Sequence, residues 1–181
     1  MANANQPFSK GYEMKAREKF AKAEGAVKSA GSRVQGDPTV FRRLKREHGE
    51  MDNLMKQILG ADVAVRISLF PKLARELRAH GYAEEQSVYR RLGRLGATRE
   101  ICASSSRTHG DLDALLGTLE RADFDSPKWM EDFKLLMKVL ERHVREEEDE
   151  LMPHAQELLD EAELAAMDAA YVAAKDLVKP N

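Results

Sequence analysis

The sequence of 181 residues contains a single cysteine, Cys102. One thiol excludes an internal disulfide framework and any metal site built from several thiolates of one chain, so a metal bound here would be held by nitrogen and oxygen. Long hydrophobic runs are also missing, because no stretch approaches the ~20 apolar residues that span a bilayer. Residues 1–10 lack the apolar core of a secretory signal, and we therefore expect a cytoplasmic protein with no membrane partner.

An excess of one charge is absent as well, since 31 acidic and 29 basic side chains nearly cancel to −2. A nucleic-acid partner, which selects for positive surfaces, is therefore not expected. The sum hides two ends of opposite sign, because the charged side chains of residues 1–37 are mostly basic, whereas those from Arg145 onward are mostly acidic. We interpret residues 1–37 as a basic N-terminal arm, and a helical and a partly disordered form both stay open. The arm could fold onto its own acidic end or onto that of a neighbour, so a homo-oligomer also stays open.

Alternating runs of β-branched residues, the usual signal of a strand, do not occur, and segments rich in Leu, Arg, Glu, Lys and Ala stand between glycine and proline turns. In four of these segments apolar side chains recur at steps of three and four, which gives each helix an apolar stripe. We expect an all-α fold, with an up-down-up-down four-helix bundle in residues 38–178 followed by a helical C-terminal extension. The expected helices are about 38–59, one that carries Phe70 and ends near Gly93, about 98–121, and one that begins at Ser126-Pro127.

Two prolines are expected to modify these helices. Pro71 lies inside the second, for which we expect either a kink or a short preceding turn capped by Asp62. Pro153 should bend or end the fourth helix. Residues 155–178 are then expected to form one or two further helices against the bundle.

Each of the four expected helices carries one histidine on its apolar stripe. A single core histidine is usually explained by a hydrogen bond to a neighbour, but one on each of four helices is difficult to explain that way. Two of them are followed four residues later by a glutamate on the same face, and buried carboxylates are rare unless they are paired or bound to metal. The histidines are His48, His80, His109 and His143, and the glutamates are Glu84 and Glu147.

An internal repeat relates these residues to one another. HGEMDNL from His48 resembles HGDLDAL from His109, and HGYAEE from His80 resembles HVREEE from His143. The repeat predicts two helical hairpins related by an approximate two-fold axis, each with one lone histidine and one His-x-x-x-Glu. Such an arrangement can enclose two metal ions, bridged by carboxylates and capped by imidazoles.

Three of the histidines are followed directly by glycine, at Gly49, Gly81 and Gly110. Glycine inside a helix costs about 1 kcal/mol relative to alanine, so these placements are locally unfavourable. Two interpretations stay open. The missing side chain either lets helices approach or a small ligand pass, or the pattern is a coincidence at positions off the stripe.

The order His, His-x-x-x-Glu, His, His-x-x-x-Glu, together with Leu-Met-Pro at 151–153, resembles the hemerythrin-like HHE cation-binding domains over about residues 40–175. The resemblance implies a four-helix bundle that holds a non-haem di-iron centre, with the two iron ions joined by an oxo or hydroxo bridge. It implies terminal ligation by His48, His80, His109 and His143 and bridging by Glu84 and Glu147.

The sequence departs from oxygen-carrying hemerythrins at two positions. Those proteins have a fifth histidine where this chain has Asp113, and an aspartate where it has Glu148. Whether Glu147 or Glu148 bridges therefore stays open, and the missing imidazole argues against simple reversible oxygen carriage. Four imidazoles and two bridging carboxylates would leave about two positions open on two six-coordinate ions. The side chains that could add a ligand or hydrogen-bond to one are Asp52, Glu85, Tyr89, Asp113 and Glu148.

For Tyr89 the favoured interpretation is packing near a helix end.

The function that these patterns favour is binding of, or reaction with, O2, H2O2 or NO, and catalase-like peroxide breakdown is its enzyme version. Oxygen, nitric oxide or iron sensing, iron storage and iron delivery without turnover are alternatives, so whether the protein is an enzyme stays open. The alternative of another class is a metal-free helical interaction module whose polar core residues fix the helix register.

Overall fold

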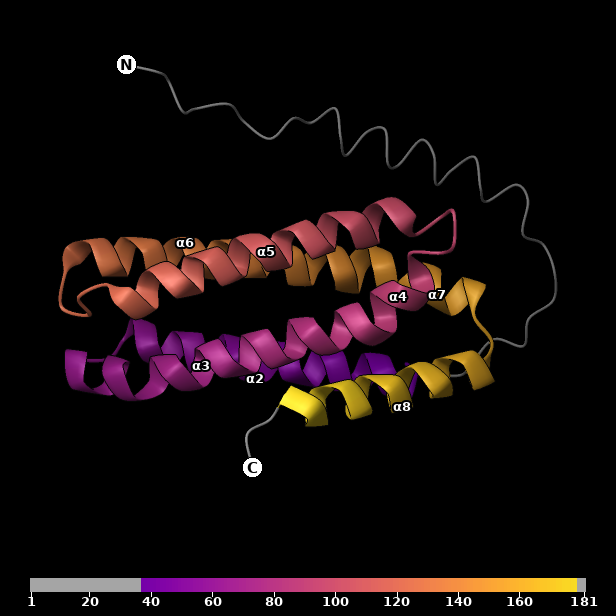
Figure 1. Ribbon diagram of the computed structural model, residues 1–181, viewed down its shortest axis with the longest axis horizontal. Helices are drawn as coiled ribbons and strands as arrows, with labels where there is room; N and C mark the ends of the chain where they lie inside the picture. Colours follow the sequence, from indigo (N-terminus) through magenta and orange to yellow (C-terminus); the bar gives the residue numbers. More distant parts are fainter. Residues whose placement is uncertain (1–36, 179–181) are drawn as a thin grey trace, which may run out of the picture. The chain divides into compact units, whose positions relative to one another are not determined.

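The computed structural model describes residues 37–178, and within them it contains helices and no strand, which confirms the all-α class. Two segments of π-helix, η1 and η2, interrupt the α-helices. The elements are α2 (Thr39–Leu59), α3 (Val63–Glu84), η1 (Glu85–Tyr89), α4 (Arg90–Leu92), α5 (Arg99–Arg121), α6 (Pro127–Glu146), η2 (Glu147–Leu151), α7 (Met152–Leu158) and α8 (Glu161–Val178) (Figure 1). Of the expected N-terminal arm, all but Asp37 lies outside the described residues. No helix among those described is long and apolar enough to cross a membrane.

The four long helices contact one another in a closed ring. α2 packs against α3, α3 against α5, α5 against α6, and α6 against α2. α8 lies along α2 and α3, and it also contacts η1 (Figure 1). The ring encloses an interior into which all four helices project their stripes, and α8 covers part of its α2–α3 side.

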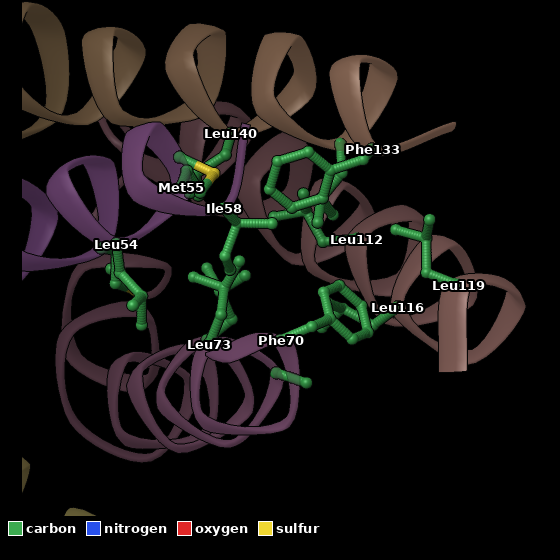
Figure 2. Packing of buried hydrophobic residues seen from close by; sticks show 14 of the residues in the cluster. Leu54, Met55, Ile58, Phe70, Leu73, Leu112, Leu116, Leu119, Phe133 and Leu140 are labelled. Atoms are coloured by element: carbon green, nitrogen blue, oxygen red, sulfur yellow. The ribbon is translucent and has the colours of Figure 1, made fainter. Parts of the chain in front are cut away.

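The hydrophobic core occupies the part of this interior that lies nearest the α2–α3 and α5–α6 turns. Side chains from the C-terminal halves of α2 and α5 interdigitate there with side chains from residues 70–77 of α3 and 129–140 of α6 (Figure 2). Phe70, Trp129 and Phe133 are completely buried within it. The stripe histidines follow at the next turns of each helix, so the core forms one wall of the site that they build.

Phe70 anchors the aromatic part of this core, and its truncation should be costly. Its ring meets those of Phe124, Trp129 and Phe133 edge to face, at centroid distances of 5.8, 5.4 and 6.2 Å. Phe70→Ala should lower the free energy of unfolding by about 3–5 kcal/mol, because it removes buried surface and leaves a cavity. Urea denaturation measures this loss. The control is Ile67→Ala, whose side chain is exposed, and a loss below about 1 kcal/mol for Phe70→Ala would refute the packing account.

The sequence signals for helix starts are found where they were expected. The Asp62 carboxylate accepts a hydrogen bond from the Val65 backbone N–H at 2.9 Å, and the Ser126 hydroxyl accepts one from the Trp129 N–H at 3.1 Å. These contacts satisfy amide groups that a helix start leaves unpaired. Asp62 caps α3 itself, which runs through Pro71 without a separate preceding turn.

The two π-helical segments are a feature that the sequence analysis did not predict. α3 passes into η1 at Glu85, and α6 passes into η2 at Glu147. A π turn adds a residue to the helical repeat and so changes which side chains share a face. Pro153 was expected to bend or end the fourth helix, but it lies in the first turn of α7, after the change at η2. Of the one or two further helices expected over residues 155–178, α8 lies wholly within that range, whereas α7 begins before Pro153.

Candidate metal centre

A buried cluster of four histidines and two glutamates lies beside the hydrophobic core, with one histidine from each long helix. We call it the His/Glu cluster. Five of its members are at most 4% exposed, and the His109 side chain is 15% exposed. The periodicity of each helix places these side chains on the inner stripe. The members are His48, His80, Glu84, His109, His143 and Glu147.

The donor atoms of the cluster form two groups. One contains His48, His80, Glu84 and Glu147, the other contains Glu84, His109 and His143, and within each group the atoms lie within 4.8 Å of one another. Glu84 belongs to both groups, because its Oε1 lies 3.1 Å from His80 Nε2 and its Oε2 lies 3.2 Å from His109 Nε2. One carboxylate therefore spans the two groups, as a bridging ligand would.

In three histidines the ring nitrogen that faces away from the cluster, Nδ1, donates a hydrogen bond to a carboxylate. A carboxylate can only accept, so in each neutral imidazole the Nδ1 atom carries the proton and the Nε2 atom presents a lone pair to the interior. The contacts from Nδ1 to a carboxylate oxygen are His48 to Glu148 at 2.8 Å, His109 to Glu85 at 3.2 Å and His80 to Glu47 at 3.1 Å.

The inward nitrogens face one another in pairs. His48 Nε2 lies 3.1 Å from His80 Nε2, and His109 Nε2 lies 3.0 Å from His143 Nε2. Two unprotonated nitrogens at this separation repel, so each pair needs a proton or a metal ion between or beside its two nitrogens. Both oxygens of Glu84, together with Glu147 Oε2, are buried and have no hydrogen-bond partner among the described residues apart from their ion-pair contacts with the cluster imidazoles. A cation would satisfy the nitrogens and these oxygens at once, so the residues present fit a metal centre.

The electrostatics of the cluster also favour positive charge. Burial lowers the pKa of His80, but Glu84 and Glu47 outweigh it and raise that pKa to about 9. Burial likewise opposes the effect of Glu84 and Glu85 on His109, whose pKa is raised to about 10. Burial raises the pKa of Glu84, but the nearby imidazoles His80 and His109 hold it well below its ordinary value. A metal ion that binds here would displace protons from these imidazoles.

Glu147 and Glu148, between which the sequence left the bridging role open, occupy different positions. Glu147 is buried in the cluster, with its Oε2 3.4 Å from His48 Nε2 and 3.9 Å from His143 Nε2. Glu148 is partly exposed and accepts from the outer nitrogen of His48. Glu84 and Glu85 divide in the same way between the cluster and His109. The π-helical segments lie where two adjacent glutamates contact opposite nitrogens of one histidine, which is His109 for Glu84 and Glu85 and His48 for Glu147 and Glu148.

Tyr89 does more than pack near a helix end. Its buried ring stacks on that of His109 with centroids 5.3 Å apart, and its hydroxyl donates a hydrogen bond to Glu147 Oε1. Burial raises the pKa of Tyr89, so the phenol keeps its proton and remains a donor. Tyr89 thereby fixes one oxygen of Glu147 and leaves the other for the cluster.

Two of the candidate residues are not brought to the cluster. The Asp52 side chain is 50% exposed and pairs with Lys56, and the Asp113 side chain is 64% exposed and pairs with Arg78. Both carboxylates belong to surface ion pairs, so the expectation that they add a ligand or support one is corrected.

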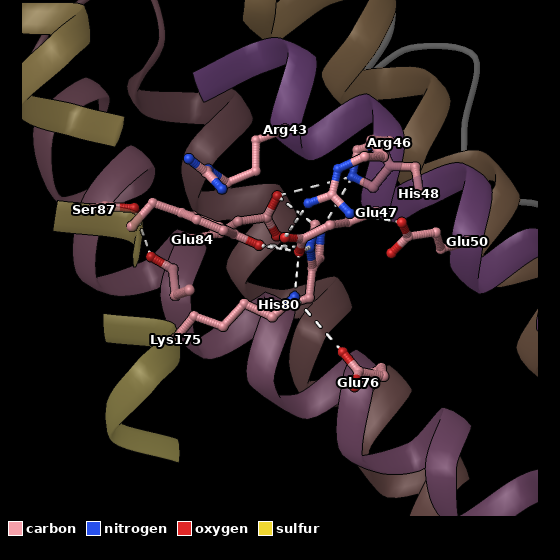
Figure 3. Close-up of polar contacts among 12 residues, drawn as sticks. Arg43, Arg46, Glu47, His48, Glu50, Glu76, His80, Glu84, Ser87 and Lys175 are labelled. Carbon is pink, nitrogen blue, oxygen red and sulfur yellow. Dashed lines mark hydrogen bonds and ion pairs between the residues drawn. The ribbon is translucent and has the colours of Figure 1, made fainter. Parts of the chain in front are cut away.

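Sequence reasoning missed three residues outside the cluster that are linked to it through His80. Glu47 is buried and accepts hydrogen bonds from the Tyr171 hydroxyl and from Lys175, both of which come from α8. In Figure 3 the Lys175 side chain extends from α8 towards Glu47 and His80. The one available signal was the place of Glu47, directly before His48 on the helix. Nothing in the local sequence ties α8 to this site.

The glycines that follow the histidines differ in their surroundings. A Cβ added at Gly49 or Gly110 would meet nothing within 4 Å, whereas one at Gly81 would lie 3.4 Å from three atoms of the His109 ring. The close-approach interpretation therefore applies to Gly81 alone.

This difference predicts the effect of alanine at each position. Gly49→Ala and Gly110→Ala should each raise the free energy of unfolding by about 1 kcal/mol, because alanine restricts the unfolded chain and costs no contact. Gly81→Ala should gain less, since its Cβ presses on the His109 ring. Urea denaturation of the metal-free proteins measures all three. An equal gain at all three positions would show that the contact with His109 imposes no constraint.

Comparison with known proteins bears on the whole helical region. The family model of the hemerythrin HHE cation binding domain matches residues 39–155. No curated protein matches the chain. No solved structure matches it either. The matched range contains all six residues of the His/Glu cluster.

Proposed function

The chain belongs to the hemerythrin HHE cation-binding domain family, and from this we propose that its His/Glu cluster holds two iron ions inside an up-down-up-down four-helix bundle. One ion would be held by His48, His80, Glu84 and Glu147, and the other by Glu84, His109 and His143. The observation that carries the proposal is the pairing of inward Nε2 atoms around a glutamate that spans both groups. Nitrogen and carboxylate donors suit iron, manganese or zinc, and the family favours iron.

The proposed activity is binding of, or reaction with, O2, H2O2 or NO. When bound, two iron ions supply one-electron redox chemistry and open coordination positions for such a ligand. The residues around them hold the imidazole protons on Nδ1, through Glu47, Glu85 and Glu148, and keep Glu147 oriented, through Tyr89. The hydrophobic core keeps bulk water from one side of the cluster.

The exposure of the cluster to solvent also supports the proposal that its ligand is a small molecule. His109 is the most exposed of its six residues, at 15% of its side chain, and its outer partner Glu85 is 34% exposed. Since no other member of the cluster is more than 4% exposed, solvent meets the cluster at this imidazole. We propose that such a ligand reaches the centre beside His109.

Anaerobic reconstitution with ferrous iron tests this function. After removal of excess iron, the protein should hold about two irons per chain, and its visible spectrum should change on addition of O2, H2O2 or NO. Sustained oxygen evolution from peroxide would identify an enzyme, whereas a stable reversible adduct would identify a carrier or sensor. The matched variants are His80→Ala/His143→Ala, which should bind little iron, and Asp52→Asn, which should bind as much as the wild type. Fewer than about two irons in the wild type, or unchanged binding in the double histidine variant, would refute the proposal.

A further inference from the structure

α8 contributes two buried polar side chains to the outer side of His80. Tyr171 and Lys175 both reach the carboxylate of Glu47, and the hydrogen bond from the Tyr171 hydroxyl to Glu47 Oε2 is 2.6 Å long. The same Glu47 oxygen lies 3.1 Å from His80 Nδ1, and the Tyr171 hydroxyl lies 2.8 Å from it. Figure 3 shows Glu47 and Lys175 meeting beside His80, where α2, α3 and α8 come together. We call Glu47, Tyr171 and Lys175 the α8 network.

The α8 network is charge-balanced although it is buried. Glu47 is 6% exposed, Lys175 is 7% exposed and Tyr171 is fully buried. The Glu47 carboxylate accepts hydrogen bonds from His80 on α3 and from Tyr171 and Lys175 on α8. Glu47 is therefore a fixed carboxylate, and its position is held from two further helices rather than by its own backbone alone.

The other half of the internal repeat has no such support. By the repeat, Thr108 stands before His109 as Glu47 stands before His48, and the Thr108 hydroxyl donates to the Ser104 carbonyl at 3.2 Å. His143 corresponds to His80, and its Nδ1 is buried without a hydrogen-bond partner among the described residues. The two halves therefore supply the same ligand types in unequal surroundings.

We propose that the α8 network makes the two metal positions inequivalent, so that the position at His48 and His80 fills first and holds its metal more tightly. This inference rests on the proposed two-metal function. A carboxylate on Nδ1 fixes the tautomer and orientation of an imidazole and strengthens its Nε2 atom as a donor. Only His80 receives this from a carboxylate that is itself locked by a tyrosine and a lysine. The position at His109 and His143 has three donor residues instead of four and one imidazole with no outer partner.

Titration of the metal-free protein with Co²⁺ tests the inference, because cobalt reports its coordination by visible absorption. The wild type should bind two Co²⁺ in two resolved steps. Glu47→Ala/Lys175→Met, which leaves no unpaired buried charge, should weaken the first step by about 10–100-fold and leave the second unchanged. Glu47→Gln keeps an acceptor for His80 and should recover part of the loss. The matched control is Thr108→Val at the equivalent position, which should change neither step. Circular dichroism verifies that each variant is folded.

The outcomes separate this inference from the function on which it rests. A wild type that binds fewer than two Co²⁺ overturns both. Two Co²⁺ bound with equal affinity, or a Glu47→Ala/Lys175→Met variant that weakens both steps alike, overturns the inference and leaves the two-metal proposal standing. A selective loss of the first step, together with partial recovery in Glu47→Gln, supports it, because a merely structural role would not discriminate between the steps.

Discussion

Glu84→Ala is expected to abolish binding of both metal ions. Glu84 is the one residue, among those that the structure describes, whose carboxylate belongs to both groups of donor atoms. Its two oxygens lie 3.1 Å from His80 Nε2 and 3.2 Å from His109 Nε2, so its removal takes a ligand from each position at once. Elemental analysis after anaerobic reconstitution should show a fall from about two irons per chain to none.

Two neighbouring carboxylates provide matched controls for this variant. Glu85→Gln changes only the outer partner of His109 and should weaken metal binding by about 10–100-fold while two irons still bind at saturation. Asp113→Asn changes an exposed ion pair with Arg78 and should have no effect on iron content. Two irons retained by Glu84→Ala would rule out its bridging role.

The second large effect is expected on metal removal. With the metal gone, the buried oxygens of Glu84 and Glu147 have, among the described residues, only the cluster imidazoles to offset the loss of the cation, which is unfavourable for the folded state. A ligand present at about 1,000 times its Kd stabilises a protein by about 4 kcal/mol. For a chain of this size that corresponds to a fall in Tm of about 8–16 °C when a chelator removes the iron. Calorimetry with and without the chelator measures it.

The variant His80→Ala/His143→Ala is the control for this experiment. This variant cannot be stabilised by bound metal, so its Tm should be independent of the chelator. If the wild type is equally indifferent to the chelator, the result would favour a metal-free helical interaction module, in which the histidines serve only to fix helix register.

Local periodicity was sufficient for the parts of the fold that depend on single helices. The recurrence of apolar residues places His48 and His143 on inner stripes, and the structure brings both to the interior. The helix starts at Asp62 and Ser126 were equally readable, because a cap is a contact between residues three apart. These features need no knowledge of neighbouring helices.

The same spacing did not predict which side chains face the cluster where this depends on how a helix is rotated about its axis. Four residues after His80 the chain turns Glu84 inward, whereas four residues after His48 it turns Asp52 outward to Lys56. Both steps are identical along the sequence. The difference arises from how each helix is rotated about its axis against its neighbours, which is set by packing and not by local spacing.

Long-range contacts were also beyond the sequence. Glu47 meets Tyr171 and Lys175 across 124 and 128 residues, and no local pattern in α8 points to them. The π-helical segments at Glu85 and Glu147 were missed for a related reason. A change of helix type there accompanies two adjacent glutamates that both contact one histidine of another helix, which becomes visible only when the helices are packed together.

Anomalous diffraction at the iron absorption edge tests the central claim most directly. Crystals of the iron-reconstituted protein should show two anomalous peaks inside the helical ring, about 3.5–4 Å apart, with Glu84 between them. One peak should lie beside His48 and His80, and the other beside His109 and His143. A single peak, no peak, or iron bound only on the surface would contradict the two-metal centre.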